Sequence, residues 1–407
     1  MRAWMVRLHR WFGLFAATFL TVAGLTGAVI AWDHEIDGWL NPDLYDAATP
    51  GPTQDPVVLA AQLEAADPRL QATWIPLSVE PGHSLLLWVV PRTNPQTGRP
   101  YALDFNQVAV NPVTGEVQAR REWGAFSLSR EHLMPFLYKL HYSLHLPAIG
   151  PVDLGVWLMG GIAIAWVLDT LIALWISFPN WAQWRRSLAF RWAQGGHKLV
   201  FDLHRSGGVW LWGLVLIVAI TSVDMNLGSQ VVKPLVKAFS PVTESQADHL
   251  PLPPPGQAVT LAAKGHDVVA QAQALAAERG WTEPAGAIYI RPGSNAWTVS
   301  FHQAGNSHGD VGLGNVLLDL DASNGRILGT TVPGEGSAGD VVLQTMFPLH
   351  SGRIIGLPGR ILVTLLGLAV ATFSVTGVLI WARKRKARLH AERNRAQRPT
   401  RVSSSAT

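Results

Sequence analysis

The sequence predicts a membrane protein: an all-α four-helix bundle that carries two small α+β modules outside the bilayer and arose by internal duplication. Three observations predict this fold class. The 407-residue chain is 48% hydrophobic and only 15% charged, which is too apolar for an ordinary soluble protein. Four apolar runs are of the kind that crosses a hydrocarbon core of about 30 Å. The order of span, polar module and span occurs twice.

The first apolar run, at 11–32, is interpreted as an uncleaved anchor because no small-residue cleavage site follows it. Later runs place the second span at 154–178, the third at 207–223 and the fourth at 361–382. The resulting segments are a first span with a cytoplasmic N-terminus (1–32), a first periplasmic α+β module (33–133), a second span region (134–178), a cytoplasmic loop (179–203), a third span (204–223), a second periplasmic α+β module (224–349), a fourth span (350–382) and a basic cytoplasmic tail (383–407).

Each polar stretch has the pattern of an α+β module. Alternating apolar residues predict strands, and Asn111 and Asp321 each open a hairpin turn that ends in glycine. The prolines at 251–255 predict a stiff spacer, and the basic tail is expected to be disordered. The first module has a helix at 57–66 and strands at 73–79, 84–90 and 102–110 before a last strand; the second has a helix at 267–279 and strands at 287–291, 297–301 and 316–320.

The distribution of basic residues predicts the orientation. Although the formal net charge is only +4, arginine and lysine crowd the tail from Arg383 to Arg388 and the loop that carries Arg185, Arg186 and Arg191. Basic segments beside membrane spans stay in the cytoplasm. Both termini are therefore expected inside, with the two modules on the opposite side of the membrane.

The sequence excludes several kinds of site. It contains no cysteine, which rules out disulfides, thiolate metal centres, iron–sulfur clusters and haem attached through C-x-x-C-H. It contains no G-x-G-x-x-G opening a helix after a strand, no P-loop and no H-E-x-x-H motif. Nucleotide-binding, ATPase and zincin activities are therefore not indicated. If the protein transfers electrons, their donor would therefore have to be another protein, a quinol or a soluble reduced flavin.

Four histidines occupy corresponding positions in the two halves. His9 and His204 lie in Leu-His-Arg sequences at the start of a span, each with a glycine four residues later, and His141 and His350 each precede a later span. With both termini inside, His9 and His204 form a pair at the cytoplasmic face, and His141 and His350 form a pair at the outer face. Two imidazoles from different helices of a bundle are typical axial ligands of haem iron. The alternative is that these side chains contact lipid headgroups.

Two other histidines are secondary candidates. His145 lies one turn beyond His141, where it would replace that ligand or bind a ring propionate. His197 lies on the same helix face as His204 but about 10 Å away along the axis. Asp169, inside the second span, is either a functional carboxylate or the partner of a nearby polar group. His34 and His132 have no counterpart in the other half, and His308 is interpreted as solvated.

The chain resembles the PepSY-associated transmembrane (PepSY-TM) family, and within it the PiuB- and FoxB-like iron-regulated siderophore reductases. The resemblance rests on Leu8-His9-Arg10-Trp11 with Leu25-Thr26-Gly27, on Leu140-His141-Tyr142-Ser143-Leu144, on Asp202-Leu203-His204-Arg205 and on Leu349-His350-Ser351-Gly352-Arg353. It implies a bacterial inner-membrane protein with two b-type haems, held by His9, His141, His204 and His350, that passes electrons to ferric siderophore in the periplasm. The third span departs from the usual Leu-Thr-Gly and has Thr221-Ser222-Val223-Asp224.

Reduction would release the iron, because the hard oxygen ligands of a siderophore hold Fe(III) far better than Fe(II). No side chain needs a covalent catalytic role. Arg353 and Arg360 are candidates to attract an anionic ferric complex, with phospholipid headgroups as the alternative partners. The expected partners are haem, ferric siderophore, an unidentified donor and the lipid bilayer, and no nucleic acid. The competing functions are a non-enzymatic regulator of a periplasmic peptidase and an electron conduit to another acceptor.

Overall fold

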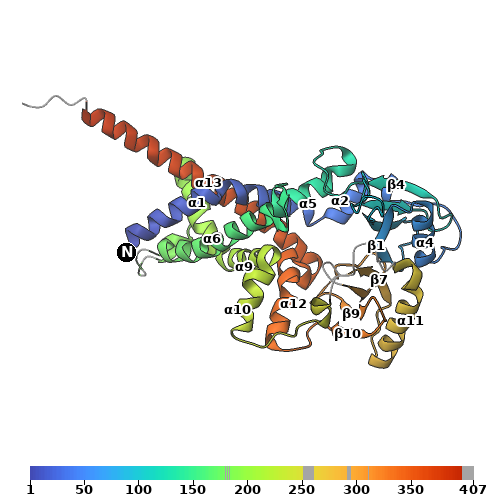
Figure 1. Cartoon of the computed structure of the whole chain (residues 1–407). Coiled ribbons are helices and arrows are strands. Elements are labelled where there is room, and N and C mark those ends of the chain that lie inside the picture. Colours follow the sequence, from blue (N-terminus) through green and yellow to red (C-terminus); the bar gives the residue numbers. More distant parts are fainter. Residues whose placement is uncertain are drawn as a thin grey trace, which may run out of the picture.

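The structure is a computed structural model that describes residues 1–178, 180, 182, 184–250, 261–290, 295–309 and 311–396. Long helices make up one end of the molecule, and an antiparallel sheet makes up the other (Figure 1). The helical end, where the N-terminus lies, is called the distal end below, and the opposite one is called the sheet end.

Four of the described helices are long and apolar enough to cross a membrane, which confirms the expected number of spans. They are α1 (Arg2–Ile30), α6 (Leu154–Ser177), α9 (Trp212–Leu227), which continues through a π-helical turn (Gly228–Val232) into α10 (Lys233–Lys237), and α13 (Leu357–Ala396). Helix α1 packs against α13 and α6, and α6 packs against α9. At Gly24 and Gly367 the α1 and α13 backbones approach so closely that an added Cβ atom would lie 2.5 Å from the facing carbonyl oxygen.

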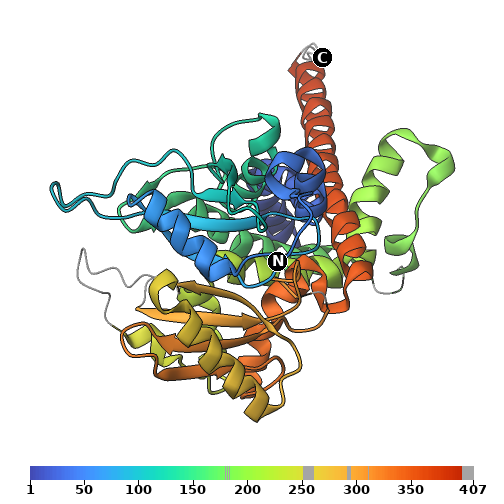
Figure 2. The same ribbon diagram turned by 90° about the vertical axis from the view of Figure 1, so that its right-hand side faces the viewer.

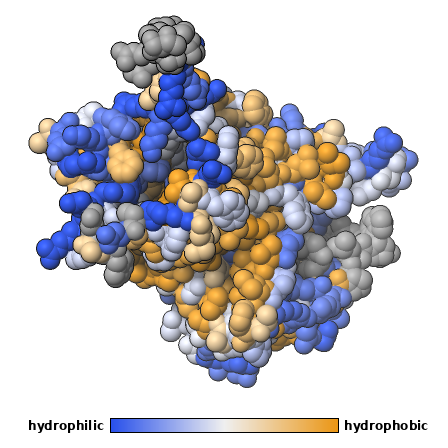
Figure 3. All heavy atoms as spheres, turned by 90° about the vertical axis from the view of Figure 1, so that its left-hand side faces the viewer, coloured by the Kyte–Doolittle hydropathy of each residue, from blue (hydrophilic) through white to orange (hydrophobic). Residues whose placement is uncertain are grey.

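Apolar side chains cover the outside of these helices. Phe15 on α1, Trp157 and Leu168 on α6, Ile220 on α9 and Leu365 on α13 are all exposed. Seen from the distal end, hydrophobic residues form a broad surface below the hydrophilic extension of α13 (Figure 3). A surface of this size and composition is typical of contact with lipid.

The sheet end consists of one eight-stranded antiparallel sheet with the order β10-β9-β8-β7-β1-β2-β3-β4. The two modules expected from the sequence are halves of this sheet, because their edge strands β1 and β7 pair with each other instead of facing solvent. The strands are β1 (Leu70–Pro76), β2 (Leu85–Pro91), β3 (Gln107–Val110), β4 (Val117–Arg121), β7 (Ala285–Ile290), β8 (Ala296–Phe301), β9 (Val316–Asp321) and β10 (Ile327–Thr331).

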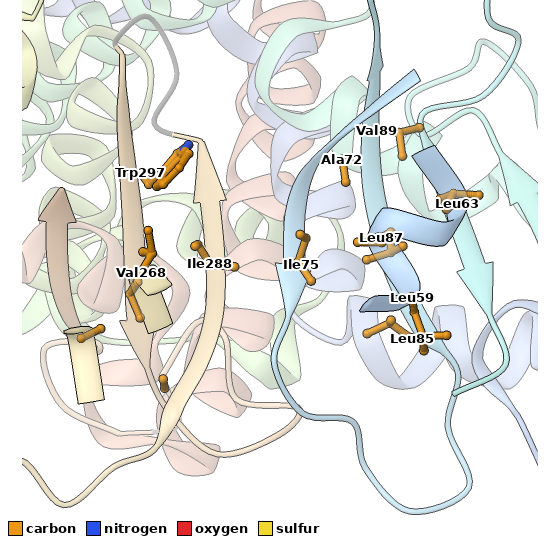
Figure 4. Packing of buried hydrophobic residues seen from close by; sticks show 14 of the residues in the cluster. Leu59, Leu63, Ala72, Ile75, Leu85, Leu87, Val89, Val268, Ile288 and Trp297 are labelled. Atoms are coloured by element: carbon orange, nitrogen blue, oxygen red, sulfur yellow. The ribbon is translucent and has the colours of Figure 1, made fainter. Parts of the chain in front are cut away.

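Both halves share one hydrophobic core. Helices α4 (Pro56–Ala66) and α11 (Leu261–Arg279) cover the same face of the sheet (Figure 2) and contact each other. At the junction Ile75 of β1 is in register with Ile288 of β7, and both are fully buried (Figure 4). Because apolar area is removed from water on both sides of the junction, the halves stabilise each other.

A buried ion pair connects the sheet to the helical end. Directly after α1, helices α2 (Asp33–Leu40) and α3 (Pro42–Tyr45) bring Asp37 to Arg121 of β4, with a closest N···O distance of 2.8 Å. Tyr45 and Asn41 also donate hydrogen bonds to the Asp37 carboxylate, each at 2.7 Å. Burial and the negative charge of Asp37 raise the pKa of the Tyr45 hydroxyl. This network keeps the sheet in a defined position at the end of α1.

Two expectations from the sequence were wrong. The third span does not begin near 204, because helix α8 (Gly196–Trp210) ends before it and a break at Leu211 precedes α9. Gly207 and Gly208 in the last turn of α8 weaken the helix there. The basic tail is helical as far as Ala396, since its alanine, arginine, lysine and glutamate residues are strong helix formers. The prolines at 251–255, Arg291 and residues 397–407 lie outside the described residues.

The remaining elements are short or connect the spans. They are α5 (Leu133–Ser143), α7 (Trp184–Leu188), α12 (Ala338–Ser351), the two-stranded hairpin of β5 (Ala148–Ile149) and β6 (Val152–Asp153), and 3-10 turns at Arg130–His132, Trp192–Gln194, Gln246–His249 and Arg353–Ile355. Of these, α5 and α12 carry two of the predicted histidines.

Candidate functional site

The structure brings the four predicted histidines together as two pairs. At the distal end His9 of α1 lies opposite His204 of α8, with 6.1 Å between ring centres and an angle of 47° between the rings. Toward the sheet His141 of α5 lies opposite His350 of α12, with 6.2 Å between ring centres and an angle of 58°. They are called the distal pair and the sheet-side pair below.

The spacing within each pair suits two ligands of one metal ion. A metal–imidazole bond of about 2 Å, with the ring centre about 1.1 Å beyond the nitrogen, places two opposed ring centres about 6.2 Å apart. Direct stacking or hydrogen bonding of the rings would bring them closer. Both pairs therefore have a ring separation that would allow the two imidazoles to hold one haem iron between them.

In the distal pair, each Nδ1 nitrogen donates a hydrogen bond to an acceptor on another helix. His9 donates to the Asp169 carboxylate on α6, at 2.9 Å. His204 donates to the backbone carbonyl of Phe373 on α13, at 2.9 Å, and approaches the Thr376 hydroxyl, at 3.3 Å. Asp169, which the sequence analysis left open, is therefore the partner that orients His9.

The sheet-side pair is held in the same way, but by uncharged groups. His141 donates to the carbonyl of Ala23, at 3.0 Å, and lies 3.1 Å from the Thr26 hydroxyl, both on α1. His350 lies 3.1 Å from the Thr221 hydroxyl on α9. The hydroxyl hydrogens of Thr26 and Thr221 point to backbone carbonyls of their own helices. Their oxygens therefore accept the hydrogen bond from the imidazole.

These hydrogen bonds fix the protonation of the four rings. Carbonyl, carboxylate and back-bonded hydroxyl oxygens are acceptors, so the proton must lie on Nδ1. None of the described residues forms a hydrogen bond with the Nε2 atom of these four rings. Each imidazole thus keeps an Nε2 lone pair available, as in metal sites where the second ring nitrogen is anchored by the protein.

Glycines provide the space in which the rings lie. An added Cβ atom at Gly27 would lie 2.9 Å from Cε1 of His141, and one at Gly377 would lie 3.0 Å from Cε1 of His204. Gly13 and Gly208, predicted to leave room for a flat ring, both line the cavity beside the distal pair, and no atom lies within 4 Å of an added Cβ. The glycines thus serve both to seat the imidazoles and to keep one wall of that cavity open.

Close helix contacts position the sheet-side histidines. The end of α5 touches the start of α6 at Gly155, where a Cβ atom would lie 1.9 Å from the carbonyl oxygen of Ser143. In the second half Gly359 of α13 has the same relation to the carbonyl oxygen of Gly352, at 1.9 Å. His141 and His350 each lie two residues before these contacts. Larger residues at Gly155 or Gly359 would push the histidine helix away from its span.

A cavity adjoins each pair. The cavity at the distal pair has a volume of ≈ 750 Å³, and the one at the sheet-side pair has a volume of ≈ 360 Å³. Both volumes lie in the range of ligand and cofactor pockets. Their linings share Leu20, Trp166 and Val370. These three side chains therefore form the wall between the cavities.

Positive charge lines the distal cavity. Arg10, Arg205, Lys384 and Arg388 contribute to its wall, whereas Asp169 is its one carboxylate among the described residues. The Nε atoms of Arg10 and Arg205 are buried, and neither has a hydrogen-bond partner within the described part of the chain. Arg205 also donates from Nη2 to the carbonyl of Arg186, but the free Nε atoms and the positive charge fit an anionic ligand such as the propionates of a porphyrin.

The secondary candidates lie outside both cavities. The Nε2 atom of His145 donates to the carbonyl of Phe136, at 2.9 Å, and its ring stacks on the Phe136 ring. His197 is exposed on α8. Neither residue faces a pair.

The two predicted substrate arginines differ in their surroundings. Arg353 lines the sheet-side cavity. Arg360 instead contacts Glu35, at 2.7 Å, and the carbonyl of Ala31, at 2.7 Å. Burial raises the pKa of Glu35, but its hydrogen bond to Arg360 and the charge of Arg360 outweigh burial, so the net shift is downward. Arg360 thus connects α13 to the end of α1.

The threonines that contact three of the four rings were not predicted from the sequence. Thr26 and Thr376 each precede one of the glycines that contact a histidine, so the repeated Thr-Gly dipeptide in the first and fourth spans was an available signal. Thr221 lacks the glycine, and only the structure shows its role. Nothing in the sequence links His34 to His308, but their rings lie 5.5 Å apart.

The chain matches the family model of the PepSY-associated TM region over residues 6–384. It therefore belongs to this family, as the residues around the four histidines indicated. The match includes both histidine pairs, the second and third candidate spans and most of the first and fourth. No match was found among curated proteins.

Proposed function

We propose that this chain is a di-haem b membrane protein that moves electrons across the bacterial inner membrane and reduces ferric siderophore on the periplasmic side. The observation that carries the proposal is the geometry of the two histidine pairs: ring centres 6.1 and 6.2 Å apart, with Nδ1 anchored in every ring and no described residue hydrogen-bonded to Nε2. A haem bound at each pair supplies reversible one-electron chemistry that no side chain of this protein offers.

The chain's own residues suit this cofactor. His9 and His204 would hold one haem and His141 and His350 the other, while Arg10 and Arg205 would bind propionates at the distal site. Along α1 the distance from His9 to Thr26 is about 25 Å at 1.5 Å per residue, which is close to the thickness of a hydrocarbon core. The two sites thus fit opposite faces of a membrane.

Trp166 lies on the route that we propose for the electron between the two sites. It lies near the middle of α6 and is the one aromatic residue among the three that line both cavities. It packs against the cluster formed by Val215, Leu366 and Val370. We infer that its indole ring shortens the gap that an electron crosses between the two sites.

We also propose an orientation of the chain in the membrane and an origin of its two halves by duplication. The basic extension of α13, with Arg383, Lys384, Arg385 and Lys386, favours a cytoplasmic distal end, so the sheet end would face the periplasm. Each half contributes a span, four strands and a histidine helix in the same order, which supports a four-helix bundle built by duplication of one unit.

The test is a visible spectrum of the full-length protein purified in detergent, oxidised and then reduced. We expect b-type bands with two haems per chain, and oxidation of the reduced protein by ferric hydroxamate or catecholate complexes with Fe(II) trapped by a coloured chelator. A colourless protein would refute haem binding and favour a regulator of a peptidase. A di-haem protein that no ferric siderophore oxidises would instead be a conduit to another acceptor.

A further inference from the structure

A third pair of histidines lies beside the sheet-side cavity, whose lining includes one of the two, His308. His34, at the start of α2, and His308, in the loop between β8 and β9, are 274 residues apart in sequence. Their rings nevertheless face each other, with Nε2 of His34 3.5 Å from Nδ1 of His308. The fold thus brings together two imidazoles that have no counterpart in the repeated pattern of the other four.

The distance between the two nitrogens is close to that expected for ligands of one ion. Nitrogen ligands at about 2.1 Å from a metal in tetrahedral or octahedral geometry lie about 3.0–3.4 Å apart. A shift of a few tenths of an ångström would therefore let both rings coordinate the same ion. The two rings are exposed, so their side chains have room for that shift.

The location connects this pair to the sheet-side histidines. His308 lines the same cavity as His141 and His350, together with Asp33 and Arg353. Its ring centre lies 5.9 Å from that of Phe347, which is one helical turn before His350 on α12. An ion that leaves the region of the sheet-side pair toward the sheet would therefore meet His34 and His308.

The ligand count indicates a transient site rather than a resident one. Among the described residues no group of three or more histidine, cysteine, aspartate or glutamate side chains lies close enough to hold a metal. Two imidazoles leave most coordination positions of the ion to water or to another ligand. Asp33 and Arg353 line the same cavity and carry opposite charges. Their charges offset each other, so together they do not repel a cation.

We propose that His34 and His308 form a divalent-metal site that receives Fe(II) as it leaves the siderophore. The inference rests on the proposed function. One electron from a reduced haem held by His141 and His350 would convert Fe(III) to Fe(II) and leave that haem oxidised. The siderophore oxygens would then dissociate, and the two imidazole nitrogens together with water would take their places. Imidazole nitrogen suits ferrous iron, whereas the oxygen shell of a siderophore suits ferric iron, so the pair selects the reduced ion.

The test uses Co²⁺, which binds nitrogen ligands more tightly than Fe²⁺ and does not depend on reduction. Isothermal titration of the full-length detergent-purified protein is expected to show one Co²⁺ equivalent. His34→Ala and His308→Ala should each weaken this binding by about tenfold or more, with unchanged haem content. His249→Ala, which removes an exposed histidine elsewhere, should bind Co²⁺ like the unsubstituted protein.

Equal Co²⁺ binding by the double variant and the unsubstituted protein would overturn the proposal. So would a loss of haem in His34→Ala or His308→Ala, because these residues would then support the cofactor instead. Failure of this metal site can be distinguished from failure of the proposed function. A protein without haem that binds one Co²⁺ at this pair would retain the metal site and lose the reductase.

Discussion

The distal and sheet-side pairs share their geometry but differ in electrostatics. In both, two imidazoles lie about the same distance apart. In the distal pair His9 donates to a carboxylate and the cavity is lined by arginine and lysine. In the sheet-side pair the acceptors are carbonyl and hydroxyl oxygens. The two pairs therefore share the spacing of their imidazoles and differ in the charged and polar groups around them.

Under the proposed function, this difference would give the two haems different properties although their ligands are alike. A carboxylate acceptor strengthens the imidazole as a metal ligand and favours the oxidised metal, whereas a neutral acceptor does so less. The cationic lining gives the distal site, in addition, a place for anionic groups. We expect the two sites to be distinguishable by potential as well as by position.

The largest expected effect comes from removing one histidine of a pair. His350→Ala should reduce the haem content from two to about one per chain and leave the distal site filled; His9→Ala should do the reverse. Haem-to-protein stoichiometry and the difference spectrum of each variant measure this. His145→Ala, which lies outside both cavities, is the control and should keep both haems. Retention of both haems in His9→Ala and His350→Ala would show that the pairs are not ligands.

Trp166→Leu sharpens the comparison by changing only the wall between the sites. The substitution keeps an apolar side chain but removes the aromatic ring shared by the two cavities. We expect both haems to remain and electron transfer between the sites to slow severalfold, measured by rapid mixing of the reduced protein with an oxidant. Trp157→Leu, which replaces an exposed tryptophan on the same helix, should transfer electrons between the sites at the rate of the unsubstituted protein. Equal rates in all three proteins would remove Trp166 from the route.

A smaller effect distinguishes the two kinds of acceptor. Asp169→Asn removes the negative charge beside His9 and should raise the potential of the distal site by tens of millivolts. Thr221→Val removes the neutral acceptor of His350 and should change the sheet-side potential by less. Redox titration followed in the visible spectrum measures both. A shift at the sheet-side site in Asp169→Asn would contradict the assignment of that carboxylate to the distal pair.

The sequence was sufficient for features that depend on local pattern. Four apolar runs predicted four membrane helices, and the Leu-His motifs identified the residues that the fold brings into pairs. It was not sufficient for features that depend on long-range contacts. The pairing of β1 with β7 joins strands about 200 residues apart, and nothing in either strand alone indicates its neighbour.

The anchors of the histidine rings show the same limit. Thr221 meets His350 only because α9 packs against α12, and a threonine in an apolar helix usually bonds to its own backbone. His34 and His308 looked like isolated surface residues because the loop between β8 and β9 has no periodic pattern. The break at Leu211 was missed because apolar residues continue across it.

The joint between β1 and β7 has a mechanical consequence for the membrane part. His141 belongs to the half of the chain that contains β1, and His350 belongs to the half that contains β7. The two halves cannot separate outside the bilayer without breaking the backbone ladder that links them. The continuous sheet therefore keeps His141 and His350 at a fixed separation, although neither residue belongs to the sheet.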